Sequence, residues 1–168
     1  MPPFRQTRNR GSCAPAPVVG GGIILRECQN RELDQVVTLE RASFADSAYS
    51  RTDFVYLMER AKGGFTVAME GDRLLGYVIA LGEGGTGIIQ SIAVTSDSRR
   101  KGIGEALLKS AVDHLSEFER IWLLVDLNNE PAIALYHKLS FSETGRVIKG
   151  YYRNGDDAVE MIRARAMR

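Results

Sequence analysis

The chain has 168 residues, of which 44% are hydrophobic and 26% are charged, and this composition is ordinary for a globular protein. A chain of this length is long enough for one domain with a core and too short for two domains of ordinary size. The formal net charge of +1 provides no overall field that would favour nucleic acid or an anionic membrane as a partner. Two cysteines, Cys13 and Cys28, cannot supply a disulfide framework or a metal-ligand spacing, and no apolar run approaches the roughly 20 residues of a membrane span.

Residues 1–22 show neither a helical nor a strand period. The stretch MPPFRQTRNRGSCAPAPVVGGG holds four of the five prolines and four glycines, and its charged side chains are Arg5, Arg8 and Arg10. This composition predicts a disordered extension, and a basic docking arm is the less favoured interpretation. No apolar signal-peptide segment follows the initial methionine, so we expect a cytoplasmic protein. The chain is therefore divided into a tail of residues 1–22 and one domain of residues 23–168.

The first half of the domain alternates between strand and helix patterns. Residues 22–28 are predicted as a strand, and a helix follows from residue 32, with apolar side chains at Leu33, Val36, Val37 and Leu39. Residues 42–54 are predicted as a loop, and a second helix covers residues 53–62. Residues 63–70 and 73–82 are predicted as two strands around a Gly-Asp turn, and residues 87–94 as a third apolar strand.

The second half adds one crossover unit and a closing hairpin. A helix is predicted over residues 102–117, a strand over 120–127 and a short helix over 129–139. Residues 145–152 and 158–164 are predicted as two strands around the RNGDD turn. This order predicts an α/β (α+β) domain in which helices flank a mixed sheet with one strand-helix-strand unit at its centre.

The boundary between the strand at 87–94 and the following helix holds Arg99, Arg100, Lys101, Gly102 and Gly104. A helix that follows a glycine-rich turn has unpaired N–H groups at its positive end, and glycines let a ligand approach them closely. Phosphate or pyrophosphate is the ligand that such a site suits best. The spacing lacks both the Gly-Lys-Ser/Thr ending of a Walker loop and a dinucleotide fingerprint. On spacing alone, a basic helix cap with a glycine turn is an equally good interpretation.

Three motifs then indicate a family. SIAVTSDSRRKGIGEALL resembles the cofactor-binding motif R/Q-x-x-G-x-G/A of the GNAT superfamily of N-acetyltransferases, with Arg99, Gly102 and Gly104 at its fixed positions. NNEPAIALYHKLSF resembles the next motif of that superfamily, with Ser140 in place of a glycine. KGYYRNGDDAVEM, together with ERASF in the first helix, resembles the protein N-terminal acetyltransferases, namely the ribosomal-protein alanine acetyltransferase group and its archaeal and eukaryotic relatives.

The resemblance implies a binding site for acetyl-CoA as cosubstrate, without a metal. The pyrophosphate would lie on the N–H groups of the glycine-rich loop, and the pantetheine arm would pair with a strand edge where the two central strands separate. The asparagine at the start of the short helix would contact the cofactor, and an N-cap is its alternative role. The residues that the resemblance places at acetyl-CoA are Ile92, Ala93, Val94, Arg99, Arg100, Lys101, Gly102, Ile103, Gly104, Asn129, Tyr136 and Lys138.

Five residues are implied to take part in catalysis or in substrate binding. Tyr136 would protonate the leaving thiolate, although a tyrosine on a buried stripe is the alternative. Asp46 is the remaining acid near the substrate slot. Tyr49, Tyr151 and Tyr152 would line the slot that holds the substrate N-terminus, and exposed aromatic residues in a hairpin are an equally good interpretation of the last two.

Two departures from the resembled group concern the catalytic base. Leu124 stands where many N-terminal acetyltransferases carry a glutamate, and Ile88 stands where some archaeal relatives carry a histidine. We expect direct transfer of acetyl to the α-amine of a protein or peptide N-terminus, without an acyl-enzyme. The ribosome or a ribosomal protein is a partner that the resemblance allows. Acetylation of a small amine or a lysine, and acetyl-CoA binding without catalysis, remain alternatives.

Overall fold

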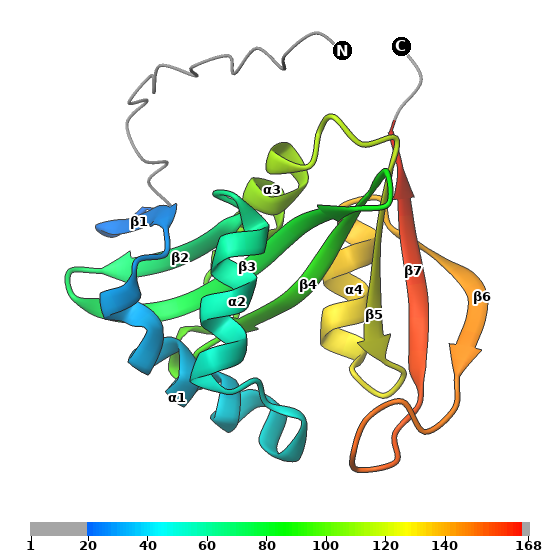
Figure 1. Ribbon diagram of the computed structural model, residues 1–168, viewed down its shortest axis with the longest axis horizontal. Helices are drawn as coiled ribbons and strands as arrows, with labels where there is room; N and C mark the ends of the chain where they lie inside the picture. Colours follow the sequence, from blue (N-terminus) through cyan, green and yellow to red (C-terminus); the bar gives the residue numbers. More distant parts are fainter. Residues whose placement is uncertain (1–19, 166–168) are drawn as a thin grey trace, which may run out of the picture.

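The computed structural model describes residues 20–165 (Figure 1). The strands in this part are β1 (Ile23–Glu27), β2 (Phe65–Glu70), β3 (Arg73–Glu83), β4 (Thr86–Val94), β5 (Arg120–Asp126), β6 (Ser142–Ile148) and β7 (Ala158–Ala164). The helices are α1 (Leu33–Phe44), α2 (Arg51–Ala61), α3 (Ile103–His114) and α4 (Glu130–Lys138), and η1 (Asn30–Glu32), η2 (Ala45–Ser47) and η3 (Ser96–Ser98) are single 3-10 turns.

The strands form one mixed sheet in the order β1-β2-β3-β4-β5-β7-β6. The neighbouring strands are antiparallel except for β4 and β5, which are parallel and are connected through α3. The predicted α/β class, the mixed sheet and the central strand-helix-strand unit are therefore confirmed.

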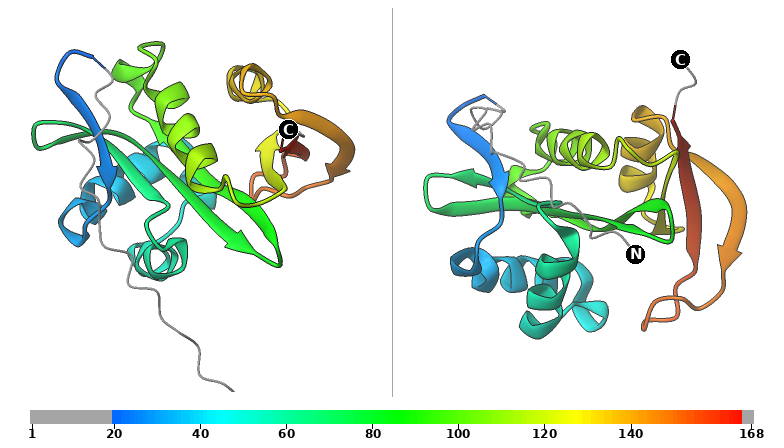
Figure 2. Two further views of the ribbon diagram at one scale, coloured as in Figure 1. Left: turned by 90° about the horizontal axis from the view of Figure 1, so that it is seen from above. Right: turned by 45° about the horizontal axis from the view of Figure 1, so that its top comes forward.

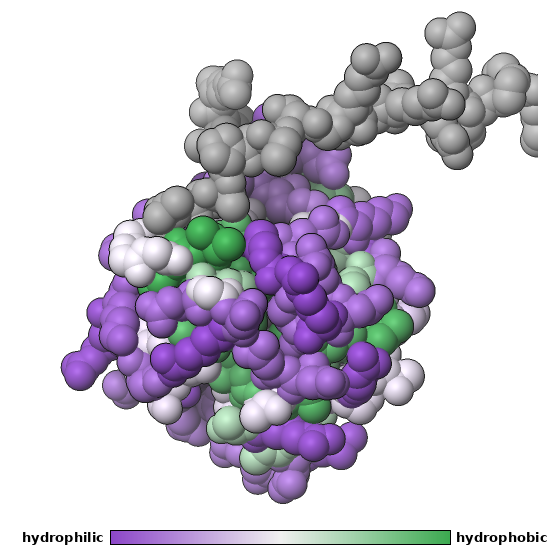
Figure 3. All heavy atoms as spheres, turned by 90° about the vertical axis from the view of Figure 1, so that its left-hand side faces the viewer, coloured by the Kyte–Doolittle hydropathy of each residue, from purple (hydrophilic) through white to green (hydrophobic). Residues whose placement is uncertain are grey.

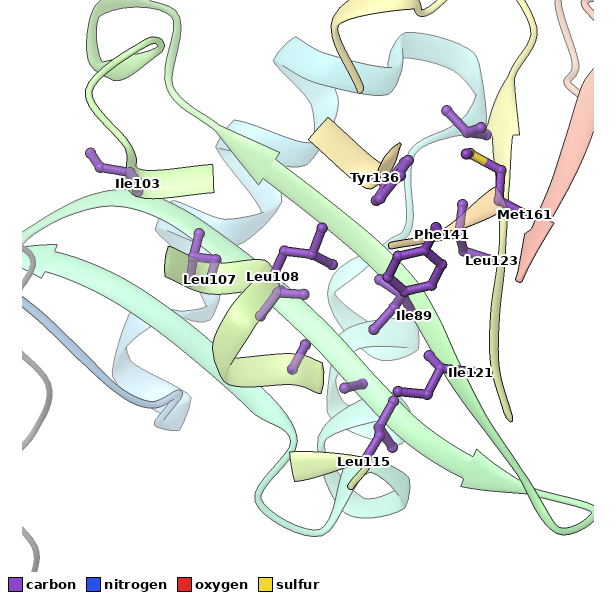
Figure 4. Close-up of a cluster of buried hydrophobic side chains, with 14 of the residues drawn as sticks. Ile89, Ile103, Leu107, Leu108, Leu115, Ile121, Leu123, Tyr136, Phe141 and Met161 are labelled. Atoms are coloured by element: carbon purple, nitrogen blue, oxygen red, sulfur yellow. The ribbon is translucent and has the colours of Figure 1, made fainter. Parts of the chain in front are cut away.

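Helices cover both faces of the sheet. Helices α3 and α4 lie on one face, and α1 and α2 lie on the other (Figure 2). Leu107 and Leu108 of α3 and its C-cap Leu115 pack with Ile121 and Phe141 in one buried cluster (Figure 4). A second cluster joins α1 and α2 to the opposite face of the sheet and includes Leu33, Val36, Phe54, Phe65 and Tyr77.

The two central strands separate after a short contact. Strands β4 and β5 pair only at Gly87 with Ile121 and at Ile88 with Trp122. Beyond these residues β4 continues its ladder with β3, and β5 continues its ladder with β7. The sheet therefore opens between β4 and β5, as the family resemblance implied.

The predicted loop at 42–54 is wrong at both ends. Helix α1 continues to Phe44, and α2 begins at Arg51. The earlier start of α2 has a local cause, because Ser50 and Asp53 form a capping box. The N–H of Asp53 donates to Ser50 Oγ at 3.2 Å, and the N–H of Ser50 donates to Asp53 Oδ2 at 2.8 Å.

The predicted strand at 145–152 is also wrong, because β6 covers Ser142–Ile148. The ladder with β7 stops at Ile148 and Ala158. The carboxylate of Asp157 then accepts the N–H of Gly150 at 2.9 Å and Lys149 Nζ at 2.6 Å, and these bonds turn the chain away from the sheet. Residues 149–157 consequently form a loop between β6 and β7.

Residues 1–19, most of the predicted tail, lie outside the described part of the chain. Gly20 to Gly22 form the turn into β1, and the N–H of Ile23 donates to the carbonyl of Gly20 at 3.2 Å. Hydrophilic side chains dominate the face at the β1 end of the sheet, with small apolar areas between them (Figure 3). Among residues 20–165, no helix combines the length and the apolarity that a membrane span requires.

Candidate active site

One edge of β4 faces the gap in the sheet. The N–H of Thr95 donates to the carbonyl of Leu75 on β3 at 2.8 Å. Because backbone groups alternate in direction along an antiparallel ladder, Ala93 turns its N–H and C=O toward β3, whereas Ile92 and Val94 turn theirs toward the gap. Ile92 and Val94 can therefore pair with an extended ligand at this edge, and the backbone of Ala93 is directed away from it.

The glycine-rich loop joins β4 to α3 through two left-handed residues. Arg99 is extended (φ −67°, ψ 155°), and Arg100 is left-handed (φ +60°). Gly102 follows at φ +80° and caps α3, in a conformation that a residue with a Cβ rarely adopts. The loop is thus folded so that the first turn of α3 starts directly at its end.

The first amides of α3 are available to a ligand. Within residues 20–165, the N–H groups of Gly102, Ile103, Gly104 and Glu105 have no backbone acceptor. A Cβ placed on Gly104 would lie 3.5 Å from Leu135 Cδ2 and 3.7 Å from Val94 Cγ2, which are ordinary contacts. The protein itself would therefore admit a methyl group at Gly104, and the unpaired amides suit an anionic group such as a phosphate.

The predicted cations around this loop differ in what they contact. Arg99, Arg100 and Lys101 are exposed, and Arg99 Nε donates to the carbonyl of Val94 at 3.4 Å. Lys138 instead forms an ion pair with Glu105, which also accepts Lys109 Nζ at 2.8 Å. Hydrogen bonds from these two lysines lower the pKa of Glu105 to about 2. In this structure Lys138 therefore links α4 to α3.

Asn129 has the capping role that was considered as the alternative to cofactor contact. It is the N-cap of α4, and its Oδ1 accepts the N–H of Ala132 at 3.3 Å. Pro131 occupies the first turn of the helix, where its missing N–H costs no hydrogen bond.

Tyr136 lies on the buried side of α4. Its ring packs edge-on against Phe141 with 5.8 Å between the ring centres, and only 5% of the residue is exposed. Within the described residues its hydroxyl has no hydrogen-bond partner, and the hydroxyl itself keeps some solvent access, so it is not an unsatisfied buried group. Burial raises the pKa of Tyr136 well above its ordinary value, so the side chain is a neutral O–H donor at neutral pH.

The opposite side of the gap is formed by the α1–α2 loop. Tyr49 Oη accepts Gln90 Nε2 at 2.7 Å, and the Tyr49 ring packs edge-on against Phe54. Gln90 is the extra residue of a bulge on β4, since Ile79 and Ala80 of β3 pair with Ser91 and Ile89. Because the bulge breaks the alternation of side chains, Gln90 and Ser91 both reach the α1–α2 face of the sheet.

Tyr151 and Tyr152 lie in the β6–β7 loop on the same side of the sheet as Tyr49. Their rings are perpendicular, with 5.0 Å between centres, and burial is the main cause that raises the pKa of Tyr152 to about 12. The N–H of Arg153 donates to Ser47 Oγ at 3.3 Å, which joins this loop to η2. The structure therefore brings the three predicted slot tyrosines to one side of the gap, with Tyr136 on the other face of the sheet.

The three positions considered for a catalytic base differ in exposure. Asp46 is exposed in η2, and among the described residues its carboxylate accepts no hydrogen bond. Leu124 is half-buried on β5, and Ile88 is buried against the α1–α2 cluster. None of these three supplies a polar group inside the gap.

A buried polar cluster beside the gap was missed by the sequence analysis. Glu40 on α1 is 1% exposed and accepts hydrogen bonds from the N–H of Tyr49 at 3.0 Å and from the hydroxyl of Tyr77. Tyr77 Oη lies 2.9 Å from Ser91 Oγ. A signal was present in the sequence, because Glu40 stands seven residues after Leu33 and so continues the apolar stripe of α1.

Metal binding has no geometric support in the described part of the chain. Within residues 20–165, no three side chains from His, Cys, Asp and Glu come together as a set of ligands. Cys28 is buried, and burial raises the pKa of its thiol to about 12.

Known proteins resemble this chain in sequence and in fold. The family model described as acetyltransferase (GNAT) family matches residues 31–141. An N-alpha-acetyltransferase of Saccharolobus solfataricus is 33% identical over 159 residues, which cover 86% of this chain and 94% of that protein. The crystal structure of Ard1 from Thermoplasma volcanium superposes with a TM-score of 0.81 at 21% identity, over 87% of this chain and 99% of the other, and supports the fold alone. Arabidopsis thaliana Naa50, solved with the bisubstrate analogue CoA-Ac-MVNAL, superposes with a TM-score of 0.73 at 25% identity, over 85% of this chain and 99% of the other.

Proposed function

The chain belongs to the acetyltransferase (GNAT) family, and from this premise we propose that it transfers acetyl from acetyl-CoA to the free α-amine at a protein N-terminus. GNAT acetyltransferases use acetyl-CoA as the donor. The finer assignment is supported by the N-alpha-acetyltransferase relatives and by the peptide analogue bound in the Arabidopsis neighbour. The main structural support for N-terminal acetylation is the gap in the sheet, which has unpaired helix amides on one side and a cluster of tyrosines on the other.

The donor side would be formed by β4, the glycine-rich loop and α4. The amides of Gly102 to Glu105 would hold the pyrophosphate, with Arg99, Arg100 and Lys101 as additional positive charge. Ile92 and Val94 would pair with the amides of the pantetheine arm. Acetyl-CoA supplies an activated acyl group and a thiolate leaving group. Tyr136, neutral and without a hydrogen-bond partner among the described residues, would donate a proton to the sulfur as the C–S bond breaks.

The acceptor side favours an amine that loses its proton easily. An α-amine has an ordinary pKa near ~7.8 and a lysine near ~10.4, so neutralising them at pH 7 costs about 1 and about 4.6 kcal/mol, respectively. Leu124 and Ile88 offer no acid or imidazole to meet the larger cost. The α-amine of a peptide entering between Tyr49, Tyr151 and Tyr152 is therefore the preferred nucleophile.

Transfer of labelled acetyl groups to matched substrates tests this proposal. One peptide has a free N-terminus and no lysine, a second has a blocked N-terminus and one lysine, and a third sample contains a small primary amine. A peptide copied from the N-terminus of a ribosomal protein joins the panel, because the resemblance includes enzymes of that class. We expect the first peptide and its ribosomal counterpart to be labelled faster than the others. Equal or faster labelling of the blocked peptide refutes the proposal, and binding of acetyl-CoA without any transfer would make the protein a non-catalytic binder.

A further inference from the structure

Three side chains from distant parts of the chain form a continuous hydrogen-bonded path. The carboxylate of Glu40 on α1 accepts the hydroxyl proton of Tyr77 on β3, and Tyr77 Oη lies 2.9 Å from Ser91 Oγ on β4. Glu40 and Tyr77 are 1% and 0% exposed, whereas Ser91 is half-buried. The path therefore leads from a half-buried hydroxyl to a fully buried carboxylate.

The accessible end of this path lies where the sheet opens. Ser91 is three residues beyond Ile88, the last residue of β4 that pairs with β5. The bulge at Gln90 directs Ser91 to the α1–α2 face, and the neighbouring Gln90 donates to Tyr49 Oη. An amine that enters between the α1–α2 and β6–β7 loops would reach Ser91 before it reaches the donor side of the sheet.

The environment of Glu40 differs from that of the other buried glutamate. Glu32, 3% exposed, is bonded to Arg26 and Arg31, and these bonds, with that from Arg26 the strongest, lower its pKa to about 2. Within the described residues Glu40 has no ion pair with a cation, and the titratable side chains near it are Tyr77 and Tyr49. Burial raises the pKa of Glu40 despite its two hydrogen bonds, so its carboxylate is a stronger base than a solvated one.

From this geometry we infer that Ser91, Tyr77 and Glu40 form the proton path that neutralises the substrate amine, with Ser91 as the catalytic contact and Glu40 as the terminal base. The inference depends on the proposed function, since it assigns a base to that reaction. The catalytic base is then Glu40, which is neither Asp46 nor a residue at the positions of Leu124 and Ile88.

Three proton transfers along this path neutralise the amine. The ammonium gives one proton to Ser91 Oγ, Ser91 gives its own hydroxyl proton to Tyr77 Oη, and Tyr77 gives its proton to Glu40 Oε2. The amine becomes neutral, the carboxylate becomes a carboxylic acid, and both hydroxyls are restored. When the C–N bond forms and the C–S bond breaks, the second amine proton leaves for solvent and the thiolate takes a proton from Tyr136, which solvent then replaces. Reverse transfer along the same path returns the Glu40 proton to water after product release.

A pH series of kcat/KM for the free-N-terminus peptide tests the path in Glu40→Gln and Ser91→Ala. A variant that has lost the base uses only the neutral amine, which is about one seventh of an α-amine of pKa ~7.8 at pH 7 and nearly all of it at pH 9. We therefore expect the ratio of wild-type to variant rates to be about 7 at pH 7 and below about 2 at pH 9. Ser91→Thr, which keeps the hydroxyl, is expected to follow the wild-type profile.

Two comparisons separate this role from simple support of the structure. Glu32→Gln, a change at an equally buried carboxylate at the start of α1, should lose thermal stability and keep the wild-type pH profile. The same ratio measured for Asp46→Asn tests the acid that the resemblance implied, and a ratio of about 7 at pH 7 there, with none for Glu40→Gln, assigns the base to Asp46. A ratio for Glu40→Gln that stays constant from pH 7 to pH 9, or equal rates at pH 7, overturns the proton path. If the wild-type protein does not acetylate the peptide at all, the proposed function fails instead, and this outcome is seen before any variant is compared.

Discussion

Replacing Gly104 by alanine and by valine should separate an effect on stability from an effect on acetyl-CoA affinity. Gly104 is the second residue of α3, and its φ is outside the left-handed range in which only glycine is relaxed. The new Cβ would meet Leu135 and Val94 at ordinary distances of 3.5 and 3.7 Å. A helical Gly→Ala change then stabilises by up to about 1 kcal/mol, which corresponds to a rise in Tm of about 2–4 °C for a domain of this size.

The effect on the ligand depends on the size of the side chain, because the family motif R/Q-x-x-G-x-G/A accepts alanine at this position. A Cβ does not block the N–H of its own residue, so alanine leaves the amide available, whereas the branched valine adds two more methyl groups beside it. We expect Gly104→Ala to keep the Kd for acetyl-CoA within about threefold, and Gly104→Val to raise it at least tenfold, or about 1.4 kcal/mol.

Isothermal titration with acetyl-CoA and a thermal denaturation curve measure the two effects on one protein sample. Gly102→Ala is the matched comparison, since Gly102 has φ +80° with open space around it, and a side chain there is strained. That variant should lose about 1 kcal/mol of stability as well as affinity. A folded Gly104→Val protein that binds acetyl-CoA with an unchanged Kd would show that the pyrophosphate does not lie on these amides.

Four further changes have separate expected outcomes. Tyr136→Phe should lower kcat at least tenfold with little change in the KM for acetyl-CoA, because the hydroxyl acts chiefly as the thiolate forms; a change confined to KM contradicts this. Ser140→Gly should raise the free energy of unfolding by about 0.5–1 kcal/mol, since Ser140 is held at φ +66°, and urea denaturation measures it. Because the pKa of Glu32 is lower in the fold than its ordinary value of 4.5, its carboxylate stabilises the fold above pH 4.5. This stabilisation is lost as the pH falls toward 2, so the Tm of Glu32→Gln should fall less steeply with acid than the Tm of the wild type. Deletion of residues 1–19 should leave Tm within about two degrees and most of the peptide turnover, because the family motifs begin after them, and a larger loss would indicate that this segment packs or docks.

The parts of the site that depend on local sequence were predictable. Gly102 has the left-handed φ that a glycine in a turn predicts, whereas the positive φ of Arg100 goes against the preference of a residue with a Cβ and was not predicted. Asn129 and Pro131 likewise predict the start of α4 from adjacent residues alone. The cofactor and substrate roles of these and the other predicted site residues stay predictions.

The parts that depend on contacts between distant segments were not predictable. The end of β6 is determined by Asp157, which binds Gly150 and Lys149 across the following loop. The partners of Glu40 come from β3 and from the α1–α2 loop, and Tyr77 stands in an apolar run that gives no sign of a polar contact. The bulge that directs Gln90 and Ser91 to one face arises from strand register, which a single sequence does not specify.

The short contact between β4 and β5 divides the backbone hydrogen bonding of the sheet into two blocks. Strands β1 to β4 form one ladder, strands β5 to β7 form another, and two residue pairs join them. Cohesion between the blocks therefore depends on side chains of α3 that pack on β5 and α4, so each block has its own cost of local opening. An extended molecule bound along Ile92 and Val94 would fill the gap between the two blocks and would make their separation less favourable. Amide exchange in β5 and β7 would then report occupancy of the gap at positions that touch no ligand atom.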